Sequence, residues 1–400
     1  MRGPLTGIRV VEMATMVAAP SCGQLLMQLG AEVIKIEGLD GDPYRNNRQI
    51  TGGHPVLFDA LNAGKKSVAI NAKNPKAKEM LMKLIGTADV FISNIRLDAL
   101  KRLGLDYMSL CENESLVYAH FSGYGENGPL SKLPGYDGTA FFVRNGVYRD
   151  FTAPDNEPIN HISGFGDMIS GLAMALNILS ALFERNQTGK GRKVSTALNQ
   201  TAVWTLLMPM IFEQFGSVYQ RKERDPFDLS TTCMLCKDGE YIYYNTGMIK
   251  QWQALCRVLG KENLINDERC LTISTIMANS KTLYSEIADV FLERNADEWI
   301  DALHAADVPC EKYRHIADMA SDIQLIENGF IKQSMYDAKS VMIPVPPVES
   351  DMLIDAESSK GEELGFHTKA ILSSVGFTDD EIGALVSSGD LIVCESQVKN

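Results

Sequence analysis

The sequence has few of the residues that build metal centres or disulfide frameworks. Its 400 residues include eight cysteines and six histidines. Only Cys233 and Cys236 form a C-x-x-C pair, and neither a second pair nor a nearby histidine completes a zinc site. A chain of this length needs no disulfides to stabilise its core, so scattered cysteines are typical of a reducing compartment. We therefore expect no metal, and we place both cysteines on a half-buried strand.

Positive charge and long apolar runs are also scarce. There are 38 lysines and arginines against 51 acidic residues, and the formal net charge is -13. Phosphate backbones require a basic field, so general nucleic-acid binding is excluded. No run approaches the roughly 18 consecutive apolar residues that span a bilayer. The start, MRGPLTGIRVVEMA, lacks an apolar signal core. We expect a cytoplasmic protein without nucleic-acid or membrane partners.

The first third of the chain alternates apolar strands with helices, which predicts an α/β fold with a parallel sheet. Strands are expected at 7–14, 31–38, 66–73, 89–95 and within 114–125, and helices at 21–30, 74–88 and 97–104. This is a Rossmann-like rhythm, but no G-x-G-x-x-G follows the first strand. Gly123–Gly128 has that spacing, yet Pro129 and a loop follow it, which argues against a dinucleotide site.

The rest of the chain shows a change of pattern near a charged segment. Residues 168–220 are expected to be mostly helical, and RKERDP at 221–226 marks a boundary. Beyond it, a hairpin around Lys237–Gly239 precedes amphipathic helices at 281–295 and 296–306, which is typical of an α+β domain. Thr378 and Glu381 form a capping box that opens a terminal helix.

One carboxylate, Asp167, stands out in HISGFGDMISGLA at 161–173. Gly164, Gly166 and Gly171 leave little bulk around it, so a large ligand can approach the backbone closely. A helix begins just beyond it, because leucines recur there at spacings of three and four. Aspartate at a helix start also serves as an N-cap. The residues alone leave both readings open, a structural cap and a reactive carboxylate.

Several segments together resemble the class III CoA-transferase family, which includes formyl-CoA transferase. In chain order they are LTGIRVVEMATMVAAPSCGQLLMQLGAEVIKIE, NAGKKSVAIN, ADVFISNIR, GYGENGPLSKLPGYD, ISGFGDMISG, TGKGRKVSTAL, DVPCEKY and LGFHT. Within the family, FDALNAGKKSV and GYDGTAFFVRNGV are most similar to 2-hydroxyacyl-CoA transferases of amino-acid-fermenting anaerobes, such as those acting on phenyllactate or 2-hydroxyisocaproate. The resemblance spans nearly the whole chain.

The resemblance implies that Asp167 is the catalytic nucleophile. CoA would pass from a 2-enoyl- or 2-hydroxyacyl-CoA to a free 2-hydroxycarboxylic acid through an aspartyl anhydride and an aspartyl-CoA thioester. Coenzyme A and acyl-CoA would then be substrates, with no prosthetic group. The remaining positions that match the family's CoA contacts are Met16, Val17, Ala18, Lys65, Lys66, Asn94 and Arg102, with Tyr136 and Asp137 bordering the active site.

The resemblance also implies an architecture, and one position departs from it. We expect a ring-like subunit in an interlocked homodimer, with a large Rossmann-like domain from 1–200 together with 330–400. A smaller α+β domain is expected at 225–325. Gly38 replaces a basic residue that binds CoA in the family, and Arg45 or Arg48 are candidates to substitute for it.

Two other functions are compatible with parts of this pattern. An α-methylacyl-CoA racemase would use a histidine and aspartate pair as its base. The histidine belongs to a G-H-D segment, where this chain has Gly135-Tyr136-Asp137, and tyrosine is a poor base at neutral pH. His161 lies six residues before Asp167, and His120 carries no motif. A non-catalytic CoA-ester-binding protein is the other alternative, and it would tolerate loss of Asp167.

Overall fold

The computed structural model describes residues 3–46, 55–152, 156–157, 159, 162–216, 228–336, 339–355 and 360–394. The chain forms two compact units. The larger unit comprises Met1–Thr152, Pro158–Ser217 and Ile326–Asn400, and the smaller one comprises Ala153–Glu157 and Val218–Leu325. The C-terminal residues thus return to the unit in which the chain starts.

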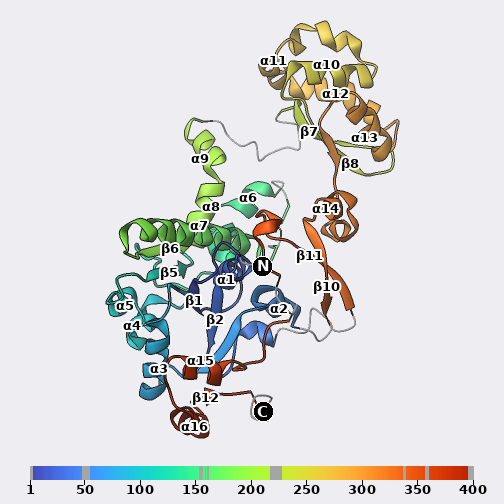
Figure 1. Cartoon of the computed structure of the whole chain (residues 1–400). Helices are drawn as coiled ribbons and strands as arrows, with labels where there is room; N and C mark the ends of the chain where they lie inside the picture. The colour runs from blue at the N-terminus through green and yellow to red at the C-terminus, as the bar shows by residue number, and fades with distance from the viewer. Residues whose placement is uncertain are drawn as a thin grey trace. The chain divides into compact units, whose positions relative to one another are not determined.

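A mostly parallel sheet forms the centre of the larger unit (Figure 1). Its order is β12-β3-β2-β1-β4-β5-β6, and β12 alone runs antiparallel to its neighbour. The strands are β1 (Arg9–Met13), β2 (Glu32–Glu37), β3 (Lys66–Ile70), β4 (Val90–Ser93), β5 (Val117–Ser122), β6 (Lys193–Ala197) and β12 (Leu391–Ile392). The order 3-2-1-4-5-6 is that of a Rossmann sheet, so the α/β prediction is confirmed. The expectation of a mostly helical 168–220 missed β6.

Helices cover both faces of this sheet because its strands alternate apolar side chains between them. Val10 points into a core shared with α1 (Ala18–Gln28) and α7 (Phe165–Thr188). Val11 points into a second core, which is shared with α3 (Pro75–Ile85), α15 (Thr368–Ser374) and α16 (Asp379–Ser387). Thr378 and Glu381 form the predicted capping box of α16.

The long helix α7 packs closely against α1. A Cβ atom at Gly171 would lie 2.1 Å from Ser21 Oγ and 3.0 Å from the carbonyl oxygen of Ala18, so this crossing requires glycine. Among the described residues, α7 is the one helix that is long and apolar enough to cross a membrane, by length and composition only. A core helix of a soluble protein passes the same test, and 44% of its most apolar window is buried.

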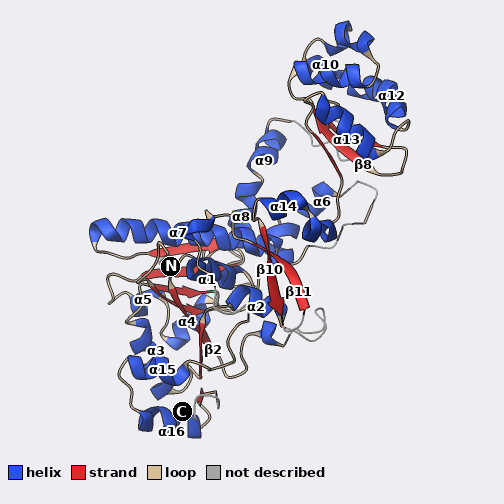
Figure 2. Ribbon diagram, turned by 45° about the vertical axis from the view of Figure 1, so that its right-hand side comes forward, coloured by secondary structure: helices blue, strands red, loops and turns tan. Residues whose placement is uncertain are grey.

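The larger unit contains further helices and one hairpin. Its other α-helices are α2 (Val56–Asn62), α4 (Leu97–Leu103), α5 (Tyr107–Leu110), α6 (Val147–Phe151), α8 (Leu198–Thr205) and α9 (Leu207–Gln214), with a π-helical turn, η3, at Asp137–Val143 and a 3₁₀ turn, η1, at Pro43–Arg45. Strands β10 (Ile331–Tyr336) and β11 (Lys339–Pro344) pair antiparallel (Figure 2).

The smaller unit is α+β and has its own core. Its antiparallel sheet contains β7 (Thr231–Leu235), β8 (Tyr241–Asn245) and β9 (Cys310–Lys312), in that order. Its helices are α10 (Ile249–Val258), α11 (Ile273–Ala278), α12 (Ser280–Phe291) and α13 (Ala296–Ala305), and α14 (Ile323–Glu327) lies at its end. Trp252, Phe291 and Trp299 are fully buried there. Cys233 lies on β7, as predicted, whereas Cys236 is buried just beyond the end of that strand.

Candidate active site

A pocket lies where β1, β4 and β5 end at the same edge of the sheet. It is lined by residues from 15–18 after β1, 94–97 after β4 and 120–126 at the end of β5, together with parts of 131–136, Asp167 and Leu198. The order of the strands reverses between β1 and β4, and ligands of open α/β sheets bind at such switch points. The pocket therefore has the position expected of a ligand site in this fold.

Asp167 faces this pocket from the first turn of α7 and is not the helix cap. The cap position belongs to Gly164, which adopts a left-handed φ of 83° and makes no side-chain capping bond. The carboxylate of Asp167 is half-buried, and no described residue donates a hydrogen bond to it. A carboxylate in this position is available to a ligand, which favours the reactive reading over the structural one.

The surroundings of Asp167 favour its protonated form. Burial, and after it the negative charge of Asp137, raise the pKa of Asp167 from 3.8 to about 7. Asp137 is buried at the start of η3. A Cβ atom at Gly166 would lie 2.4 Å from Asp137 Oδ1, so glycine at this position lets the second carboxylate pack against the turn that carries Asp167.

The segment after β1 is held by side chains from the neighbouring strands. Asn94 Nδ2 donates to the carbonyl oxygen of Thr15 at 2.8 Å, and Thr15 N donates to Asn94 Oδ1 at 3.1 Å. The next residue, Met16, adopts a φ of 69°, which is unusual for a residue with a side chain. Met16, Val17, Ala18, Asn94 and Tyr136 all line the pocket, so most of the predicted contacts come together here.

Three ionisable residues that line the pocket, His120, Glu126 and Arg96, were not predicted as site residues. Ring nitrogens of His120 lie 2.7 Å from Glu126 Oε1 and 3.0 Å from the carbonyl oxygen of Ile95. The hydrogen bond with His120, assisted by Lys193, lowers the pKa of Glu126 to about 2. Arg96 is exposed at the start of α4. The sequence signal that could have identified these residues is their position at the carboxyl ends of predicted strands, because those ends gather at one edge of a parallel sheet.

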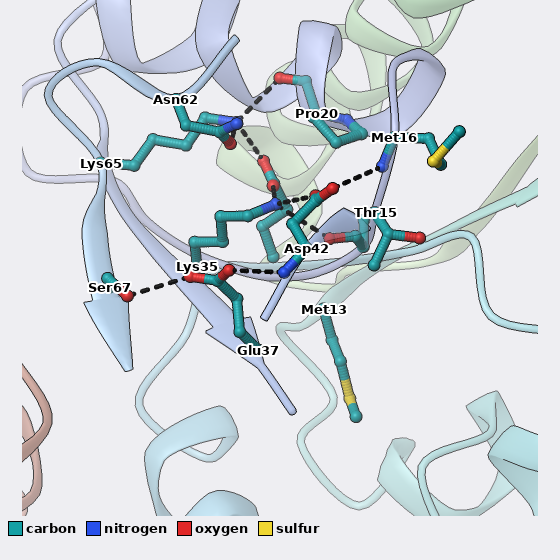
Figure 3. Close-up of polar contacts among 12 residues, drawn as sticks. Met13, Thr15, Met16, Pro20, Lys35, Glu37, Asp42, Asn62, Lys65 and Ser67 are labelled. Atoms are coloured by element: carbon teal, nitrogen blue, oxygen red, sulfur yellow. Dashed lines mark hydrogen bonds and ion pairs between the residues drawn. The ribbon is translucent and has the colours of Figure 1, made fainter. Parts of the chain in front are cut away.

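Two predicted CoA contacts have other partners and do not line the pocket. Lys65 is buried, and its Nζ donates to Glu12 Oε2 at 2.8 Å and to the carbonyl oxygen of Pro20 at 2.8 Å (Figure 3). Burial lowers the pKa of Lys65 to about 8. The Nζ of Lys66 contacts Glu32 Oε1 at 2.5 Å, near the amino end of the sheet. Carboxylates thus engage the charges of both lysines in this structure, and their contact with CoA stays a prediction.

Arg102 and Asp137 also lie outside the pocket wall. Arg102 is exposed in the last turn of α4, and Asp137 is buried behind Gly166. Arg45, a candidate to replace the basic residue at Gly38, makes two 2.7 Å hydrogen bonds to Glu37 and lies 3.9 Å from the ring centre of Phe58. It is held in place by these contacts.

Some candidates cannot be placed. Arg48 and His161 lie outside the described residues. Within the described part of the chain, no group of three or more histidine, cysteine, aspartate or glutamate side chains is arranged to hold a metal ion.

Comparison with known proteins identifies the family. A model of CoA-transferase family III matches residues 5–362. The chain belongs to CoA-transferase family III. It is 33% identical to the (R)-2-hydroxy-4-methylpentanoate CoA-transferase of Clostridioides difficile, over 94% of this chain and 97% of that protein. It is 31% identical to the cinnamoyl-CoA:phenyllactate CoA-transferase of Clostridium sporogenes, over 97% of each.

Solved structures show the same fold. The structure of Rv3272 from Mycobacterium tuberculosis matches with a TM-score of 0.82 and 26% identity, covering 92% of this chain and 99% of that one. A CAIB/BAIF family protein from Brucella suis matches with a TM-score of 0.78 and 29% identity, covering 94% and 100%. The chain is thus a CoA-transferase whose substrates are CoA esters, as the resemblance predicted.

The raised pKa of Asp167 predicts how stability depends on pH. A folded pKa near 7 exceeds the ordinary 3.8, so the wild type loses stability as pH rises through 7. Asn in its place has no proton to lose. Asp167→Asn should therefore gain stability relative to the wild type between pH 5 and pH 8.5, as measured by urea unfolding. A stability difference between the two proteins that is the same at both pH values would contradict the raised pKa of Asp167.

Proposed function

We propose that this CoA-transferase moves CoA between a 2-enoyl- or 2-hydroxyacyl-CoA and a 2-hydroxycarboxylic acid, through covalent intermediates on Asp167. The observation that carries the proposal is the Asp167 carboxylate, which faces the pocket without a hydrogen bond from any described residue. The names of two relatives, which act on 2-hydroxy-4-methylpentanoate and phenyllactate, support the substrate class.

The reaction needs four acyl-transfer steps. The Asp167 carboxylate attacks the donor thioester, the C–S bond breaks, and CoA leaves as a thiolate, so that a mixed anhydride of Asp167 and the donor acid remains. The thiolate attacks the aspartyl carbonyl, which releases the donor acid and leaves an aspartyl-CoA thioester. The acceptor carboxylate then displaces the thiolate to form a second anhydride. Finally the thiolate attacks the acceptor carbonyl, which yields the new CoA ester and restores Asp167.

The start of α7 supplies groups that assist these steps. The first N–H groups of a helix lack partners within it, so those near Gly166 can donate to the oxyanions of the tetrahedral intermediates. Only the anionic form of Asp167 is a nucleophile, and the raised pKa makes that form increase through pH 7. Burial also removes water that would stabilise the carboxylate, which favours attack on the thioester.

The CoA ester is proposed to lie along the segments after β1 and β4. Met16, Val17 and Ala18 supply backbone groups, and Asn94 holds the segment that carries them. Arg96 and Arg102 present exposed guanidinium groups on one short helix, and these are suitable partners for the phosphates. Tyr136 is exposed and borders the acyl end.

The geometry supports transfer over racemisation. Tyr136 occupies the place of the histidine that a racemase would use, and tyrosine is a poor base at neutral pH. The only histidine that lines the pocket among the described residues is His120. Its ring nitrogens are engaged by Glu126 and by the carbonyl of Ile95, so neither is free to remove a substrate proton.

We propose a homodimer that covers an apolar surface on α8 and α9. No residue of α9 is buried, and Trp204 and Phe215 are 74% and 85% exposed. The exposed apolar residues of this surface are Val203, Trp204, Leu207, Met208, Met210, Ile211, Phe212 and Phe215. Such a continuous apolar surface is typical of an interface, and the family's interlocked dimer is the expected arrangement.

None of the eight cysteines forms a disulfide, which supports the proposal that the protein works in a reducing cytoplasm.

The nucleophile is tested by Asp167→Ala. We expect transfer to fall by at least a thousandfold, because no other described carboxylate faces the pocket without a partner. Wild type incubated with acyl-CoA alone should carry an adduct on the peptide containing Asp167, which hydroxylamine traps. Asp98→Ala, at an exposed carboxylate on α4, is the matched control and should keep activity. Near-normal transfer by a folded Asp167→Ala enzyme, without an adduct in wild type, would contradict the proposal.

The substrate class is tested with a panel of acceptor acids. We expect 2-hydroxyisocaproate or phenyllactate to give a kcat/KM at least tenfold above those of oxalate and carnitine, with the same acyl-CoA donor. Leu97, Leu133 and Leu198 line the pocket and favour an apolar side chain on the acceptor. A preference for oxalate or carnitine would leave the family unchanged and remove the proposed substrates.

The homodimer is tested by mass. Light scattering should give twice the chain mass of 44.1 kDa. Trp204→Glu combined with Phe215→Glu should lower the dimer population or the soluble yield, because charges would be buried at the interface. A wild-type enzyme that is a folded, active monomer at micromolar concentration rules this proposal out.

A further inference from the structure

Six charged side chains gather beneath the segment that follows β1. Figure 3 shows Lys35, Glu37, Asp42 and Lys65 among them. Three are acidic and three are basic, so the group is electrically balanced. Its members are Glu12, Lys35, Glu37, Asp42, Arg45 and Lys65. All are buried except Arg45, whose side chain is 15% exposed. Burying charges is costly even when they are paired, so a group of this size calls for a role beyond stability.

The group contacts the backbone of the segment on both sides of Met16. Lys35 Nζ donates to the carbonyl oxygen of Ala14 at 3.0 Å and to Asp42 Oδ2 at 3.0 Å. Asp42 Oδ1 accepts from Met16 N at 3.4 Å and from Tyr44 N at 3.0 Å. The Lys35–Asp42 pair therefore connects the residue before Thr15 with the residue after it.

The residue between these contacts has a strained backbone. Met16 and Asp307 are the non-glycine residues with positive φ among those described, and Met16 lies in the pocket wall. A left-handed backbone is unfavourable for a residue with a Cβ, and it persists only where the surroundings impose it. Asn94 holds Thr15 from the opposite side through two hydrogen bonds. These hydrogen bonds therefore explain how Met16 keeps its strained backbone conformation.

We propose that Lys35 and Asp42 are positioning residues for CoA-ester binding, because they hold Met16 in its left-handed conformation. This inference rests on the proposed binding of the CoA ester along 16–18. Neither side chain lines the pocket, so both act through the backbone of the segment. Lys65 contacts the chain later, at the carbonyl oxygen of Pro20, and its other partners are Glu12 and Asn62.

Asp42→Asn tests the inference directly. The amide keeps the shape of Asp42 but loses the charge that pairs with Lys35, so the hold on Met16 weakens. We expect KM for the acyl-CoA, and its Kd by calorimetry, to rise about tenfold, while kcat stays within about twofold. Asp89→Asn is the matched control. Asp89 Oδ2 accepts from Arg9 N at 2.7 Å, at the opposite edge of the sheet. It should lower the melting temperature without changing KM.

Rescue by glycine separates positioning from general stability. Glycine adopts positive φ readily, so Met16→Gly removes the need for support. The double variant Met16→Gly/Asp42→Asn should have a KM within about threefold of Met16→Gly alone. A purely structural role of Asp42 predicts the same loss in both backgrounds. If Asp42→Asn folds poorly, Lys35→Met/Asp42→Asn removes one charge of each sign and should show the same rise in KM.

The possible outcomes distinguish a failure of the positioning role from a failure of the proposed reaction. If Asp42→Asn leaves KM and Kd unchanged, if Asp89→Asn raises them as much as Asp42→Asn does, or if Met16→Gly gives no rescue, the positioning role is wrong. If the wild type binds acyl-CoA without transferring it, the proposed reaction fails and the Kd values still test positioning. If the wild type binds no CoA ester, both proposals fall.

Discussion

Parallel pairing of β1 with both β2 and β4 is the constraint on which the site depends. Because all three strands run in the same direction, the segments that follow β1 and β4 emerge at one edge, beside the end of β5. Helices cover both faces of the sheet, and ligands of open α/β sheets bind at this edge, outside the carboxyl ends of the strands. The starts of α1 and α7 meet the same edge, and their close contact at Gly171 brings Asp167 beside 16–18.

The reactivity of the proposed nucleophile follows from what surrounds it. Asp167 is half-buried next to a second, buried carboxylate, and its anionic form is therefore less stable than it would be in water. Gly164 makes the left-handed turn that starts α7, and Gly166 leaves room for Asp137. The glycines around Asp167 thus serve the fold of this turn as well as the approach of a ligand. The destabilised anion of Asp167 lowers the stability of the folded protein, and the same destabilisation makes the carboxylate more reactive.

The positively charged side chains near the pocket of this acidic protein have two different roles. Lys35, Lys65 and Arg45 neutralise carboxylates beneath the pocket, and Arg96 and Arg102 stay exposed beside it. Buried cations with satisfied hydrogen bonds are poor ligands for phosphate, because moving them would leave a carboxylate unpaired in the interior. This division explains how a chain with a net charge of -13 can offer local positive charge to an anionic cofactor.

The sequence by itself determined the α/β class and most strands and helices, through alternation along strands and leucine spacing along a helix. The glycines around Asp167 left both a cap and a reactive carboxylate open, and the resemblance to the family made Asp167 the candidate nucleophile. The pattern of 168–220 did not reveal β6, because a short strand between long helices carries little signal. Tertiary structure alone decided that Lys65 is engaged by Glu12, that His120 reaches the pocket, and that burial, and after it the charge of Asp137, raise the pKa of Asp167. Ion pairs, burial and pKa depend on residues far apart in the chain, so only the folded arrangement specifies them.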